Sequence, residues 1–175
     1  AFSIATFSRP SCTESGRTQR LVFSGDIGRS GLPIIRDPEP PSGANVVVME
    51  STYGNRTHES TEGARARLAA VIRETAARGG RVLIPAFAVG RTQELVYDLH
   101  ILAGTGAIPS IPIYIDSPLA IDTTSVFEMH PDLFDHGEDL VRTVHDLFRF
   151  ELVHYTRDVE ESNALGKMHG PMVII

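Results

Sequence analysis

Three acidic residues stand where the chemistry of an α/β protein is usually found. Asp26, Glu50 and Asp116 each end or closely follow an apolar run that predicts a strand. In open α/β sheets, ligands bind at the carboxyl ends of the strands. Aspartate is also common in turns and helix caps, so spacing alone leaves a purely structural role open for Asp26 and Asp116.

Other common devices for chemistry are missing from the sequence. The stretch at 166–168 lacks the upstream glycine and the Ser or Thr of a phosphate loop, and the one at 104–106 lacks a third glycine. The seven histidines are not spaced as a ready zinc motif, so each one taken singly is expected to be a surface or packing residue. The single cysteine, Cys12, excludes an internal disulfide and favours a reducing, cytoplasmic setting.

The elements that must position the acidic residues follow from apolar periodicity. Apolar runs predict strands at 20–23, 45–50, 81–85, 111–115, 150–154 and 172–175. Helical spacing predicts helices at 61–78, 91–102, 118–129, 139–148 and 159–165. Strands alternating with helices of this length predict an α/β fold, a mostly parallel sheet with helices on both faces. The stretch 1–18 has no usable period and is expected to be irregular.

Composition limits the class of protein. The chain has 175 residues, of which 42% are hydrophobic, and a formal net charge of -6 at pH 7. These values are typical of a globular domain, and they argue against a simple basic protein that coats nucleic acid. They do not exclude an enzyme that acts on nucleic acid through local positive charge. No apolar run predicts a membrane helix, and no secretory leader is expected.

Several long sequence motifs favour a functional role for these residues, because the motifs resemble those of one family in order and spacing. They are S-G-D-I-G-R at 24–29, M-E-S-T-Y-G-N-R-T-H at 49–58, I-P-A-F-A-V-G-R-T-Q-E at 84–94, Y-I-D-S-P-L-A at 114–120 and E-E-S-N-A-L at 160–165. Together they resemble the β-CASP branch of the metallo-β-lactamase-fold ribonucleases over residues 19–175. The resemblance implies that 19–58 ends a metallo-β-lactamase-like lobe. It implies that 59–175 is a β-CASP cassette, truncated at its C-terminal end.

The resemblance also implies roles for particular residues. The aspartate of the S-G-D motif, here Asp26, bridges two zinc ions in the family, so that a shared water ionises and attacks the phosphorus of RNA. The glutamate of E-S-T-Y-G, here Glu50, orients a catalytic histidine from a later part of the chain and is not a metal ligand. The cassette is implied to be a lid that covers the metal site and grips the RNA backbone.

Two cassette residues are predicted to contact RNA. Arg91 stands at a predicted helix start after Gly90, where backbone N–H groups and a guanidinium could seat a phosphate. Ser117, at the start of the next helix, could donate to a second phosphate. The alternatives are a salt bridge for Arg91 and ordinary helix capping for Ser117. Tyr53 could stack on a base, but packing is the more common role of a tyrosine at a strand end.

The sequence also departs from the family pattern. The H-x-H-x-D-H zinc motif is absent, and the stretch at 1–11 stands where a G-H-x-L-G-S segment is expected. A frameshift upstream of Glu14 would explain this, and the nucleotide sequence would show it. Of the family's metal ligands only Asp26 is present, so this chain alone is expected to be metal-free and inactive. Truncation is also expected to expose surface for self-association.

These observations lead to one main hypothesis and two alternatives. The main hypothesis is a fragment of a zinc-dependent ribonuclease that hydrolyses RNA phosphodiester bonds, with exonuclease and endonuclease activity both open. The first alternative is a non-catalytic RNA-binding or scaffold protein that has lost its metal site. The second alternative is a metallohydrolase that acts on a small molecule. The cassette motifs disfavour it, because they are typical of proteins that process nucleic acids.

Overall fold

The computed structural model describes residues 11–14, 17–26, 28, 30–57, 59–130, 134–135 and 146–175. The chain divides into two compact units, Ala1–His58 and Glu59–Ile175, and each is described by itself.

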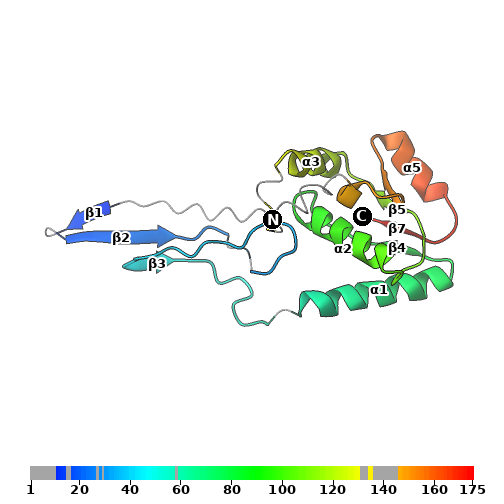
Figure 1. The fold of residues 1–175 in the computed structure, drawn as a ribbon. Coiled ribbons are helices and arrows are strands. Elements are labelled where there is room, and N and C mark those ends of the chain that lie inside the picture. The colour runs from blue at the N-terminus through cyan, green and yellow to red at the C-terminus, as the bar shows by residue number, and fades with distance from the viewer. Residues whose placement is uncertain are drawn as a thin grey trace. The chain divides into compact units, whose positions relative to one another are not determined.

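The first unit contains a three-stranded sheet (Figure 1). Strand β1 (Ser11–Glu14) pairs antiparallel with β2 (Arg17–Phe23), and β2 pairs parallel with β3 (Val46–Val48). Strand β3 is a β-branched run, which suits a pleated strand. Val22 and Ile34 are the buried apolar side chains in the described part of this unit.

Two features of this unit differ from the sequence-based expectations. The stretch 1–18 is not irregular throughout, because residues 11–14 form β1 and pair with residues 17–20 in a tight antiparallel ladder. The strand predicted at 20–23 begins earlier, at Arg17, and it is only partly buried, since Phe23 is exposed while Val22 is buried. Successive side chains of a strand point to opposite faces, and only one face of β2 is covered in this unit.

The second unit contains the predicted parallel sheet. Its four strands are β4 (Arg81–Leu83), β5 (Ile113–Ile115), β6 (Val153–Tyr155) and β7 (Met172–Ile174). They lie in the order β4-β7-β5-β6, and every pairing is parallel. The predicted α/β class is therefore confirmed. The last strand in the sequence lies between the first two, so the carboxyl ends of β4 and β5 flank the end of β7.

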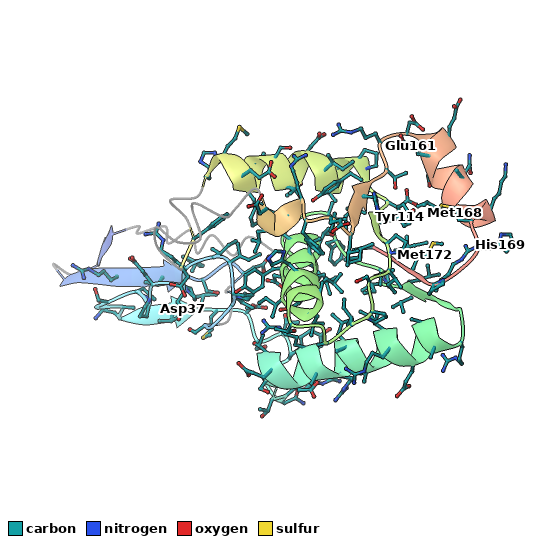
Figure 2. The ribbon with its side chains drawn as sticks, turned by 45° about the vertical axis from the view of Figure 1, so that its right-hand side comes forward. Asp37, Tyr114, Glu161, Met168, His169 and Met172 are labelled. Atoms are coloured by element: carbon teal, nitrogen blue, oxygen red, sulfur yellow. The ribbon has the colours of Figure 1, made fainter. Side chains whose placement is uncertain are left out.

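Helices cover both faces of this sheet (Figure 2). They are α1 (Thr61–Ala77), α2 (Arg91–Gly104), α3 (Pro118–Met129) and α5 (Val159–Lys167). The first three form a layer on one side, and α5 lies on the other side. Ile113, Ile115 and Val173 are fully buried in the core of this unit. The helix predicted at 139–148 falls outside the described residues except for a helical turn at 146–148.

Three of these helices are preceded by a residue whose side chain caps the first turn. Ser60, Ser117 and Asp158 accept backbone hydrogen bonds from the first turns of α1, α3 and α5. Helix α2 begins differently, because Gly90 precedes it with φ 80° and ψ -66°. There the N–H of Arg91 donates to the carbonyl of Val89 at 3.0 Å, which closes a γ-turn around Gly90.

We expect the γ-turn to require glycine. In the variant Gly90→Ala, a Cβ at positive φ is strained, so unfolding should become easier by about 1–3 kcal/mol. Urea unfolding followed by circular dichroism measures this. The matched control is Gly104→Ala at the last position of α2, where an added Cβ meets nothing within 4 Å and stability should be unchanged or slightly higher. Equal stability of Gly90→Ala and the wild type would contradict the assignment.

Candidate functional site

The two predicted catalytic carboxylates lie at the same end of a parallel strand pair in the first unit. Asp26 follows β2 and Glu50 follows β3. The ladder continues past the strands, since the N–H of Ser24 donates to the carbonyl of Val48 at 2.9 Å. The buried hydroxyl of Ser24 accepts from the N–H of Glu50 at 3.3 Å and donates to the carbonyl of Gly25 at 2.7 Å. Both carboxylates are exposed.

The described residues do not assemble a metal site. Nowhere within them do three or more His, Cys, Asp or Glu side chains gather in a way that could hold a metal ion. A catalytic zinc ion ordinarily has three protein ligands and a water. Asp26, the one carboxylate that the family resemblance assigns to the metals, therefore does not fit zinc by itself.

In the second unit, the loop that enters α2 is tied down by its own helix. The carbonyl of Phe87 accepts from the hydroxyl of Thr92 at 2.9 Å and from its N–H at 3.3 Å. With the N–H of Arg91 bonded to Val89, the first two N–H groups of α2 are used within the loop. The expected phosphate seat at the start of α2 therefore depends on the Arg91 side chain rather than on these two N–H groups.

The Arg91 side chain is in an ion pair, but it remains accessible. Its guanidinium contacts a carboxylate oxygen of Glu94 at 2.9 Å, in the i,i+3 geometry. The side chain of Arg91 is 60% exposed and that of Glu94 is 19% exposed. An ion pair with one solvent-exposed partner is screened by water and typically contributes only about 0.2–1 kcal/mol. A phosphate could therefore compete with Glu94 easily.

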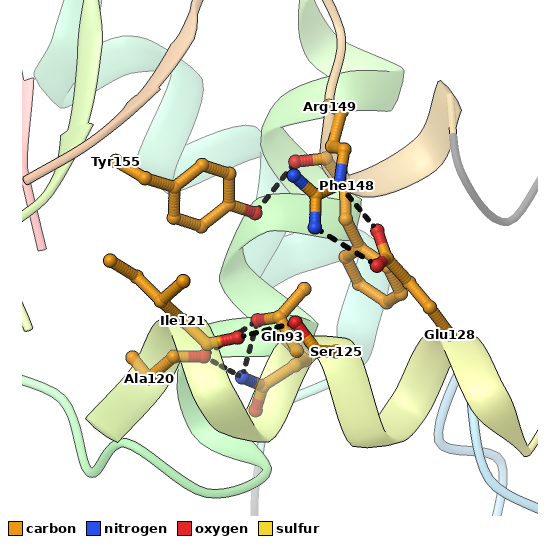
Figure 3. A network of polar contacts seen from close by, with 9 residues as sticks. Gln93, Ala120, Ile121, Ser125, Glu128, Phe148, Arg149 and Tyr155 are labelled. Carbon is orange, nitrogen blue, oxygen red and sulfur yellow. Dashed lines mark hydrogen bonds and ion pairs between the residues drawn. The ribbon is translucent and has the colours of Figure 1, made fainter. Parts of the chain in front are cut away.

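A buried glutamine joins the start of α2 to the start of α3 (Figure 3). Gln93 is fully buried, and its Oε1 accepts from the N–H of Gly90 at 2.8 Å. Its Nε2 donates to the hydroxyl of Thr124 at 3.0 Å and to the carbonyls of Ala88 and Ala120 at 3.2 and 3.4 Å. One side chain thus holds the α2 loop against the first turns of α3. We call these contacts the Gln93 clamp.

The second predicted RNA contact, Ser117, is the cap of α3. Its Oγ accepts from the N–H of Ala120 at 3.3 Å, and this bond leaves the hydroxyl proton available to a ligand. The preceding residue, Asp116, makes a second tie, because its Oδ2 accepts from the hydroxyl of Ser162 at 2.9 Å. That bond joins the end of β5 to α5. Asp116 therefore is not the cap that the sequence left open for it, but a link between distant elements.

Arg91 and Ser117 are brought to one edge of the parallel sheet. Arg91 begins the helix after β4, and Ser117 immediately precedes the helix after β5. Only β7 lies between these two strands, so their ends are about 10 Å apart. The Gln93 clamp fixes the two helix starts against each other. The predicted RNA-binding pair therefore occupies the edge at which open α/β sheets bind ligands.

A second polar network stabilises the far part of α3. Arg149 makes two bonds to Glu128, at 2.8 and 3.0 Å, and lies over the ring of Tyr155 (Figure 3). The Tyr155 hydroxyl donates to the carbonyl of Phe148 at 2.7 Å. Burial raises the pKa of Tyr155 to about 12, so the phenol keeps its proton and goes on donating in alkaline solution as well as at neutral pH. The polar groups of this network satisfy one another, so its role is structural.

Sequence reasoning missed the residues that hold the site together. Gln93 stands at the third position of a helix, where Glu or Gln commonly bonds back to the cap, and this signal could have indicated one of its contacts. The partners Thr124 and Ser162 carry no such signal. The surface or packing role predicted for each histidine is confirmed for two of them, since the ring of His100 contacts Phe150 and the ring of exposed His154 contacts Tyr114.

The second unit is an α/β protein with its predicted site residues at one edge of a parallel sheet, and comparison with known proteins indicates the family. Residues 92–175 match the family model described as Beta-Casp domain. Ribonuclease TTHA0252 of Thermus thermophilus is 34% identical over 165 residues, covering 91% of this chain and 37% of that protein. Endoribonuclease YSH1 of Saccharomyces cerevisiae is 33% identical over 156 residues, covering 84% and 20%. Transcription termination factor FttA of Pyrococcus abyssi is 36% identical over 133 residues, covering 74% and 20%.

The chain thus carries a Beta-Casp domain and is similar over most of its length to β-CASP nucleases of the metallo-β-lactamase type, as its sequence motifs indicated. It spans 37% of the length of the Thermus relative and 20% of the other two. In the described part of the chain, no helix has both the length and the apolar composition needed to cross a membrane.

We expect the Gln93 clamp to stabilise the second unit strongly. Gln93→Met keeps the volume but leaves the N–H of Gly90 and the carbonyl of Ala88 without their partner, which should lower the free energy of unfolding in urea by roughly 2–4 kcal/mol. A double-mutant cycle with Thr124→Val should show a coupling of about 0.5–3 kcal/mol. Ser125→Ala on the same helix is the control, since its hydroxyl bonds within α3, to Ile121. Additive effects of Gln93→Met and Thr124→Val would contradict the clamp.

Proposed function

We propose that this chain is part of a zinc-dependent nuclease that hydrolyses RNA, and that residues 59–175 act as its RNA-gripping lid. Relatives with which it shares about a third of its residues are named ribonuclease and endoribonuclease. The observation that carries the proposal is the placement of Arg91 and Ser117 at one sheet edge by the Gln93 clamp. A rigid edge with a guanidinium and a hydroxyl suits two phosphates of one strand.

The proposed division of work follows from what the chain contains. The Arg91 guanidinium would exchange Glu94 for a phosphate, and Ser117 would donate its proton to a second one. Asp26 and Glu50 are proposed as residues of the catalytic centre of the whole protein, with Asp26 as a metal ligand and Glu50 as the partner of a histidine. The name endoribonuclease among the relatives favours cleavage within RNA over removal of its ends. A cytoplasmic location remains a prediction.

A second candidate function is RNA binding without catalysis. One observation favours it, namely that Asp26 does not belong to any group of three or more metal-binding side chains among the described residues. Both candidates predict RNA binding through Arg91, and they differ in whether the whole protein cleaves RNA. They are distinguished by a cleavage assay on the product of the full open reading frame.

The first test addresses the RNA grip. Arg91→Gln should weaken binding of a single-stranded RNA and lower the slope of log K against log salt by about 0.7, the value for one single-strand phosphate contact. Glu94→Gln should strengthen binding, because it releases the guanidinium from its ion pair. Fluorescence anisotropy of labelled RNA over a range of salt concentrations measures both effects.

The matched control for this test is Arg78→Gln. Arg78 is an exposed arginine after α1, at the opposite end of the sheet, and its guanidinium contacts the Thr75 hydroxyl at 3.4 Å. Its loss should change affinity less than that of Arg91. If Arg91→Gln and Arg78→Gln weaken binding equally, the interaction is general electrostatics and the proposed seat is wrong.

The second test addresses the metal. After dialysis this chain should retain less than one tightly held zinc ion, because one exposed carboxylate does not offset the dehydration of a divalent ion. It should also show no RNA cleavage that Asp26→Ala abolishes. Metal analysis and a labelled-RNA assay, with Asp26→Ala in parallel, measure this. A stoichiometric zinc ion that is lost in Asp26→Ala would overturn the expectation.

A further inference from the structure

The loop that enters α2 displays an aromatic ring to solvent. Phe87 is 84% exposed, which is the largest exposed fraction among the large apolar side chains of the described residues. An exposed phenylalanine keeps apolar surface in water, and a flat partner that covers the ring removes this surface from water. We infer that the Phe87 ring is a stacking platform for a base of single-stranded RNA. This inference rests on the proposed function and adds a base contact to its phosphate contacts.

The exposure of Phe87 does not come from a loose loop. The carbonyl of Phe87 accepts two hydrogen bonds from Thr92, at 2.9 and 3.3 Å. The next residue, Ala88, is bonded through its carbonyl to Gln93, and Gly90 is fixed by the same glutamine. A backbone held in this way presents the ring in one place. Such preorganisation lowers the entropy cost of binding a flat partner.

The surroundings of the ring favour RNA as its partner. The accessible guanidinium of Arg91 lies one residue before Thr92, whose N–H and hydroxyl contact the Phe87 carbonyl. Exposed Leu119 stands in the first turn of α3, which the Gln93 clamp holds against this loop. An aromatic ring and a cation that stand four residues apart on one short, hydrogen-bonded segment match a base and a phosphate of the same strand, and stacking tolerates any base. In a duplex the face of the base is already covered, so the partner is a single strand.

The experiment uses the fact that the chain has no tryptophan. Phe87→Trp places one fluorescent reporter at the ring, and titration with a short oligoadenylate should quench it saturably. An abasic ribose-phosphate oligomer of equal length should quench far less, because it offers charge without a base. Phe87→Ala should weaken oligoadenylate binding by about 5- to 150-fold, the range of one base–aromatic stack.

Val159→Trp is the matched control. Val159 is also exposed, but it begins α5, which lies on the other side of the sheet from α2 (Figure 2). A tryptophan there should not respond to RNA. Circular dichroism of each variant confirms that the fold is kept, which is expected because both positions are exposed.

The outcomes separate this inference from the proposed function. If oligoadenylate binds in an Arg91-dependent way but does not quench Phe87→Trp, and Phe87→Ala binds equally well, the stacking inference is wrong while the RNA grip stands. Equal quenching by the abasic oligomer also overturns the inference. So does fluorescence of Phe87→Trp that changes with protein concentration alone, because a second copy of the chain then covers the ring. If the wild-type chain binds no RNA, the proposed function itself fails.

Discussion

The second unit depends on one buried amide. Gln93 is fully buried, and burial of an amide is costly unless its hydrogen bonds are made. Its contacts reach the α2 loop on one side and α3 on the other, so the amide is satisfied only when both elements are in place. This constraint fixes the distance between the two helix starts. The placement of Arg91 and Ser117, and the proposed grip on RNA, follow from it.

Residues of the family motifs mainly form hydrogen bonds of this kind, which join separate elements. The motif at 84–94 contains Thr92 and Gln93, whose side chains hold the α2 loop by hydrogen bonds. The motifs at 114–120 and 160–165 are in contact through the hydrogen bond between Asp116 and Ser162, which joins β5 to α5. In the first unit, Ser24 of the S-G-D motif joins the ends of β2 and β3 by a hydrogen bond. The exposed residues of these motifs are the candidates for contact with a ligand.

This arrangement separates rigidity from recognition in the second unit. The side chains of Thr92 and Gln93, which bond the loop, belong to buried residues, whereas Phe87 and Arg91 project from the same short segment into solvent. A rigid loop that carries an aromatic ring and a cation requires little ordering when a flexible strand binds. The weak ion pair of Arg91 with Glu94 keeps the guanidinium near its working position without burying it.

The sequence by itself determined the α/β class, the parallel sheet and most element positions, because apolar periodicity and crossover length are local properties of the chain. It also offered the ion pair of Arg91, since Glu94 is three residues away, and the cap at Ser117. Only the tertiary structure decided the strand order β4-β7-β5-β6 and the partners of Gln93 and Asp116. Those contacts join residues 31 and 46 positions apart, and a polar residue carries no local mark of a partner that only the folded chain brings near.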